Sequence, residues 1–149
     1  DLVIANTALT IYLAFTAGGI LLGGYIADRT HRHNLVAASC FLVTSILMFI
    51  IAVTPLPAML LITLFAIQGT MHGLIMPSRD MMVRAVTPEG SMGKVFGFVS
   101  TGLNLGSVVG PIIFAYLLDI GAPQMVFFVI SGLMLVSMTT VFTSIKTSR

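Results

Sequence analysis

The 149-residue chain is 57% hydrophobic and only 8% charged, with seven basic and five acidic side chains. Soluble domains carry about 25% charged residues, so this composition excludes an ordinary soluble fold. Long unbroken apolar runs favour helices over the alternating strands of a membrane barrel. Cys40 is the one cysteine, which excludes an internal disulfide framework. The predicted fold class is all-α, a polytopic membrane helix bundle.

Five apolar segments are each long enough for the about 20 residues that a bilayer core requires. They run over about 2–27, 35–53, 58–76, 93–118 and 124–145. Pro77 is expected to close the third span, and the segment 78–92 is the longest polar link. These spans predict a single transmembrane domain over 1–149. Because the chain begins with Asp1 and no charged n-region precedes the first apolar run, we expect a piece of a longer protein.

The basic residues predict the orientation of the spans. All seven fall on one side of the predicted topology, while the other side holds only Asp1 and Asp119; the seven are Arg29, Arg32, Arg79, Arg84, Lys94, Lys146 and Arg149. The positive-inside rule then places the N-terminus of the chain outside and the C-terminus in the cytoplasm. We expect an integral protein of the plasma membrane, the inner membrane of a bacterium.

Three spans carry a polar face when residues are placed at about 100° intervals. Its members are Asn6 and Thr10 on the first span, Gln68 and His72 on the third, with Arg79 beyond them, and Ser100, Thr101, Asn104 and Ser107 on the fourth. The second and fifth spans carry only scattered Ser and Thr. Because polar groups are costly against lipid, we expect three helices around a polar space and two apolar helices outside them.

Small residues also recur at four-residue spacing. Gly69, Gly73 and Pro77 form one such row, and Gly102, Gly106 and Gly110 form another. Such rows let helices approach closely or bend, and they are also common in plain helix packing. The polar residues are open to two interpretations as well. Ser and Thr can bond to their own backbone, and a buried amide or imidazole is either functional or an interhelical structural bond.

The turn Asp28–His33 holds an acid, two arginines and two histidines in six residues. Asp28, His31 and His33 would be candidate metal ligands, but one short loop rarely completes a coordination shell. We therefore interpret the segment as a solvated turn. We expect no metal, no cofactor and no nucleic-acid partner.

The same turn resembles a family signature. Gly24-x-x-x-Asp28-Arg29-x-x-Arg32 is similar to the loop motif of the major facilitator superfamily, which follows the second helix of each six-helix half. The family pattern has Gly at His31 and a basic residue at His33, and these departures are more usual in the C-terminal copy.

Two further stretches carry the resemblance. The row Gly97, Gly106, Gly110 and Pro111 resembles the glycine-proline motif of the family's antiporters, although Phe114-Ala115 replaces its closing Gly-Gly pair. Gln68-Gly69 resembles part of the fourth-helix motif, whose arginine is replaced by Phe65.

The resemblance implies helices eight to twelve of a twelve-helix secondary transporter, which moves a small solute by alternating access. In that family the eighth, tenth and eleventh helices line the pathway. The implied partners are a small solute, protons as the candidate coupling ion in efflux, the lipid bilayer and the N-terminal half of the same protein. Asp28 is expected to latch one conformation by pairing with Lys94 at the positive N-terminal end of the fourth helix.

Two other classes stay open. A non-transporting membrane subunit or sensor fits the composition, but it does not account for three polar faces. An integral-membrane enzyme would use His31, His33 and His72 with the aspartates. Against it, His72 lies within a span while the other two histidines lie at its edge, and the chain has no paired-acid motif.

Overall fold

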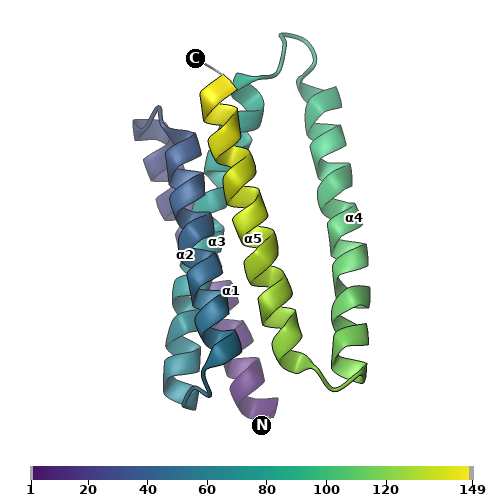
Figure 1. The fold of residues 1–149 in the computed structure, drawn as a ribbon. Helices are drawn as coiled ribbons and strands as arrows, with labels where there is room; N and C mark the ends of the chain where they lie inside the picture. Colours follow the sequence, from purple (N-terminus) through teal and green to yellow (C-terminus); the bar gives the residue numbers. More distant parts are fainter. Residues whose placement is uncertain (1, 148–149) are drawn as a thin grey trace.

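The structure is a computed structural model. It describes residues 2–147, and for residues 142 and 144–147 it describes the backbone alone. It contains five helices in this range: α1 (Leu2–Arg29), α2 (His33–Val53), α3 (Ala58–Ala85), α4 (Met92–Asp119) and α5 (Pro123–Thr147). Each is long and apolar enough to cross a membrane. The predicted all-α fold class with five transmembrane helices is confirmed. The helices run alternately up and down, so the two termini lie at opposite ends (Figure 1).

Helix α3 is longer than the predicted third span, because it continues through Pro77 to Ala85. A proline inside a helix removes one backbone hydrogen bond and crowds the carbonyl four residues earlier, here that of Gly73. Transmembrane helices tolerate this when neighbouring helices pack around the break. Helix α1 packs against this proline: the Cδ of Pro77 lies 3.2 Å from the place where a Cβ on Gly23 would stand.

Helices α1 and α3 are held together by direct contact between their backbones. A Cβ added to Gly19 would lie 2.5 Å from the carbonyl oxygen of Thr70. From the other side, Gly69 lies against the carbonyl of Tyr12, and Gly73 against the carbonyl of Thr16. Small residues at helix interfaces allow this close approach in membranes. Larger side chains at these positions would therefore drive the two helices apart.

Helix α2 lies between α3 and α5 and is the most covered helix of the chain. Its contact with α5 includes a reciprocal pair of serines: each hydroxyl of Ser45 and Ser131 donates to the other's carbonyl oxygen over 3.0 Å. Helix α2 is therefore central within this chain, and the expectation that it lies outside a polar pathway stays a prediction. The small residues Ala37, Ala38 and Cys40 let it enter the centre, where all three are buried.

Helix α4 stands apart from the other four (Figure 1). It has no buried residue, and its contacts are limited to α5 and, more weakly, α3. The expected polar space between α1, α3 and α4 is therefore not enclosed in this chain. The physical reason is that α4 has no interhelical anchor: Gly97, Gly102 and Gly106 have no neighbour within 4 Å of an added Cβ.

The α1–α3 contact makes a stability prediction. Gly19→Ala should lower the thermal unfolding midpoint of the protein by several degrees, since forcing a methyl group against the Thr70 carbonyl is an overpacking change that typically costs about 1–3 kcal/mol. The matched control is Gly18→Ala on the same helix, where an added Cβ has nothing within 4 Å. That change should leave the midpoint unchanged or raise it, because Ala is the better helix former. Equal midpoints for the two variants would contradict the proposed packing.

Candidate substrate pathway

The charged residues separate along the bundle axis. The ends of α1 and α3 and the starts of α2 and α4 lie together, opposite the N-terminus (Figure 1). Arg29, Arg32, Arg84 and Lys94 all lie at this end, and Asp119 lies at the other. The structure thus collects the described basic residues at one end of a helix bundle, with Arg79 six positions before the end of α3.

The predicted polar face of α3 is divided between two surroundings. Gln68 is buried, with only 5% of its surface exposed, and its Oε1 has no hydrogen-bond partner. His72, one turn further, is exposed, and its ring stands edge-on to that of Tyr12 at 6.0 Å between centroids. His72 is therefore available to the proposed pathway, whereas Gln68 faces the interior of the bundle.

On α1, the predicted residues Asn6 and Thr10 are exposed. The Thr10 hydroxyl donates to the carbonyl of Asn6 at 2.8 Å, so its proton is used within the helix. Tyr12 lies one turn from Thr16 and contacts both Phe65 and His72 through its ring edge. The structure therefore brings α1 and the His72 region of α3 together through Tyr12.

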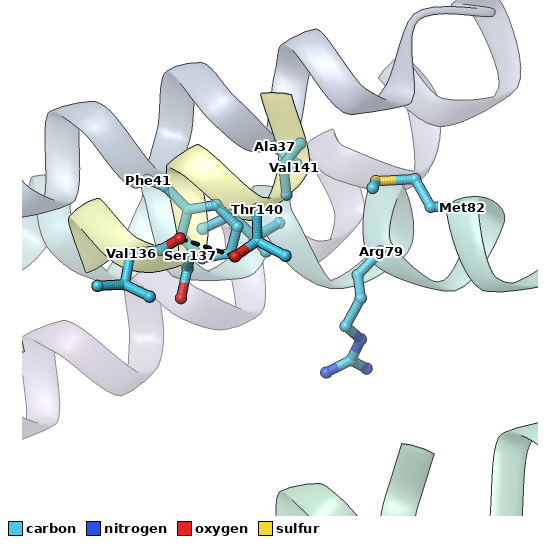
Figure 2. Close-up of a pocket in the computed structure, with 9 residues that line it drawn as sticks. Ala37, Phe41, Arg79, Met82, Val136, Ser137, Thr140 and Val141 are labelled. Atoms are coloured by element: carbon cyan, nitrogen blue, oxygen red, sulfur yellow. Dashed lines mark hydrogen bonds between the residues drawn. The ribbon is translucent and has the colours of Figure 1, made fainter. Parts of the chain in front are cut away.

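A cavity of about 300 Å³ lies between α2, α3 and α5, and Figure 2 shows the residues that line it. Its walls are largely apolar, and Arg79 is the one member of the predicted polar face that reaches it. The Arg79 side chain extends away from the other labelled residues (Figure 2). Its Nε and Nη2 donate to Asp80 Oδ1 at 3.1 and 2.8 Å. This cavity is therefore distinct from the predicted polar pathway.

The polar face of α4 is not joined to that of α1 and α3. Ser100, Thr101 and Asn104 are exposed, and the Thr101 hydroxyl donates to the carbonyl of Gly97 at 2.9 Å. The glycine row is also open. Gly110 meets only the Phe114 ring of its own helix, and Pro111 is exposed inside the helix.

The predicted latch between Asp28 and Lys94 is not formed in this structure. Both side chains are exposed, and the ion pair found among the described residues joins Arg79 to Asp80. The start of α4 does not pack beside the end of α1 here, since these helices share no extensive contact, so the latch stays a prediction. Arg29 instead places its guanidinium 4.2 Å from the centre of the Tyr25 ring.

The remaining motif residues lie on open surfaces. Gly24 has nothing within 4 Å of an added Cβ, and Arg32 is exposed before the first turn of α2. Within the described part of the chain, no three His, Cys, Asp or Glu side chains gather in a way that could hold a metal ion. Within the turn, Asp28, Arg29, His31 and Arg32 are exposed.

Three contacts were missed from the sequence. Gly19 and Gly23 have the same four-residue spacing as Gly69 and Gly73, so the row on α1 was detectable but was overlooked. The Ser45–Ser131 pair had no such signal, because each serine is isolated on an apolar helix. Tyr12 was likewise inconspicuous among apolar residues.

Five membrane-length helices with their basic residues at one end define an integral membrane protein of the helix-bundle class. Residues 1–148 match the Major Facilitator Superfamily, so the chain belongs to this family, and the resemblance seen in the sequence is confirmed.

One similar protein is described as a Na(+), Li(+), K(+)/H(+) antiporter of Planococcus maritimus. It is 32% identical over 117 residues, which cover 76% of this chain and 28% of the antiporter. The chain therefore spans less than a third of the length of this relative. No solved structure matches this chain.

The division of the α3 face can be tested by thiol labelling. In a full-length transporter whose other cysteines are replaced, including Cys40, we expect His72→Cys to react with a small water-soluble maleimide. Gln68→Cys, one turn away on the same helix, should stay unlabelled in the folded protein and react only after denaturation. Equal labelling of the two positions would contradict the exposed and buried assignments.

Proposed function

We propose that the chain is the C-terminal-half segment of a secondary transporter that exchanges alkali cations for protons. The similarity to a relative described as a Na(+), Li(+), K(+)/H(+) antiporter carries this proposal, together with membership of a transporter family over residues 1–148. The relative is more than three times longer than the matched segment, which supports a further transmembrane half outside this chain. The role is transport and not catalysis.

The mechanism proposed is alternating access, in which two halves rock about a site near the bilayer midplane. Asn6, His72, Ser100 and Asn104 supply exposed polar groups for the solute or the facing half. Polar groups are costly against lipid, so these surfaces require protein or water beside them. The basic end of the bundle faces the cytoplasm of a bacterium in this proposal, following the positive-inside rule.

This chain offers little fixed negative charge for a cation at mid-depth. Asp28 and Asp80 lie toward the basic end of the bundle, and Asp80 is paired with Arg79. We therefore assign the carboxylate that binds the cation to the other half of the transporter. His72 is the mid-span titratable candidate here, since imidazole is the side chain whose ordinary pKa lies between pH 5 and 8.

The direct test uses the full-length protein in everted membrane vesicles that carry a respiration-driven pH gradient. Adding NaCl, LiCl or KCl should release protons from the vesicles, seen as recovery of the fluorescence of a pH-gradient dye. Choline chloride is the control salt and should give no recovery. A correctly inserted protein that moves no protons with any of the three cations would overturn the proposal, and a response to organic solutes alone would assign another substrate class.

The role of His72 is tested by His72→Gln, which removes the titrating group and keeps a polar side chain. If His72 carries the coupling proton, exchange should fall and its dependence on pH should flatten over the range in which the imidazole of the wild-type protein titrates. His31→Gln, in the exposed turn before α2, should keep the wild-type profile. An unaltered pH profile in His72→Gln would exclude it as the coupling group.

A further inference from the structure

Helices α2 and α3 carry all of the buried side-chain atoms that lack a hydrogen-bond partner among the described residues. They are His33 Nδ1 and Thr44 Oγ1 on α2, and Gln68 Oε1 and Ser78 Oγ on α3. Thr44 is 3% exposed, Gln68 5% and Ser78 0%. Buried polar atoms in folded proteins are almost always paired with protein or with ordered water. Four unpaired buried atoms on two neighbouring helices therefore need a common explanation.

The four residues form two pairs at matched depth. Helices α2 and α3 are antiparallel neighbours joined by the short segment 54–57. Thr44 precedes the end of α2 by nine positions, and Gln68 follows the start of α3 by ten. At 1.5 Å per residue, both lie about 14–15 Å from the connecting turn. His33 and Ser78 are each twenty positions, or about 30 Å, from it.

The direction of the Thr44 face follows from its neighbours on α2. Ser45 faces α5, because it bonds Ser131. Thr44 is about 100° around the helix from Ser45, on the row His33, Ala37, Cys40 and Thr44, and the other neighbour of α2 is α3. On α3, Gly69 and Gly73 face α1, which leaves the side with Gln68 and Ser78 for α2.

Thr44 also behaves differently from the other helical threonines. A threonine inside a membrane helix ordinarily donates to a carbonyl three or four residues earlier. Every other helical threonine with a described side chain does so, namely Thr7, Thr10, Thr16, Thr63, Thr70, Thr101, Thr139, Thr140 and Thr143. The Thr44 hydroxyl is therefore free for a partner across the interface.

We propose that two ordered water molecules bridge α2 and α3, one between Thr44 and Gln68 and one between His33 and Ser78. A water can accept the Thr44 proton while it donates to the amide oxygen of Gln68, so one molecule completes both groups. At the second level, the other water bonds both His33 Nδ1 and the Ser78 hydroxyl. Two polar atoms at each level suit water, because an alkali cation needs more oxygen ligands than either pair supplies.

The first test is a structure of the full-length transporter in lipid nanodiscs at about 2 Å resolution. A solvent peak within about 2.7–3.2 Å of both Thr44 Oγ1 and Gln68 Oε1, and a second between His33 and Ser78, would support the proposal. A direct Thr44–Gln68 bond, or back-bonding of Thr44 to its own helix, would overturn it. So would a peak with four or more oxygen neighbours at cation distances.

The second test is a double-mutant cycle read as thermal unfolding midpoints. Thr44→Val or Gln68→Leu alone should lower the midpoint by several degrees, because each change leaves the other residue and the water with an unmade hydrogen bond. The double variant should lose less than the sum, since no buried polar atom is left. Thr63→Val, whose hydroxyl is bonded to Met59 of its own helix, is the control and should add independently to Gln68→Leu.

Strictly additive losses for Thr44→Val and Gln68→Leu would overturn the bridge. The cycle is repeated in NaCl, LiCl and choline chloride. Equal midpoints in the three salts support water, whereas a rise with Na⁺ or Li⁺ that both variants abolish would assign a cation instead. Neither result depends on whether the full-length protein exchanges cations for protons, so failure of this inference is distinguishable from failure of the proposed function.

Discussion

The backbone contact between α1 and α3 is the constraint that sets how the side chains of these two helices lie relative to each other. Gly19 and Gly73 bring the two helices so close that the atoms of one main chain touch the other. Because Tyr12 lies on the same side of α1, its ring meets that of His72 on α3. The glycines therefore set how His72 lies against Tyr12. A change in the separation of α1 and α3 would also move Arg79, which lies nearer the basic end of α3.

Helix α2 connects this pair to α5 through a different kind of chemistry. Its α5 side is closed by direct hydrogen bonds between Ser45 and Ser131, in which every donor has an acceptor. Its α3 side carries Thr44 and His33 atoms that have no protein partner. One helix thus carries a directly paired serine contact toward α5 and buried polar atoms without a protein partner on its other side.

Much of the fold could be predicted from the sequence, since a membrane helix must satisfy its backbone internally and must span about 30 Å of hydrocarbon. Length and hydropathy therefore locate the spans, and the basic residues separate the two ends. Helical periodicity places Gln68 and His72 on one face, but it does not say which neighbour covers each residue. Pro77 gave the wrong helix end, because the space left by Gly23 lies on another helix. The Asp28–Lys94 pair is not formed here, and sequence order likewise does not show which helices touch.

Helix α4 is the part of the chain with the least packing around it. Its Ser100, Thr101 and Asn104 are exposed, and no residue of the helix is buried. A hydroxyl such as that of Thr101 can satisfy itself on its own backbone, but the Asn104 amide has no such local partner. An amide facing lipid is unfavourable, whereas an amide facing water or a second protein surface is not. The exposed polar face of α4 is therefore the face of this chain that most requires water or protein beside it.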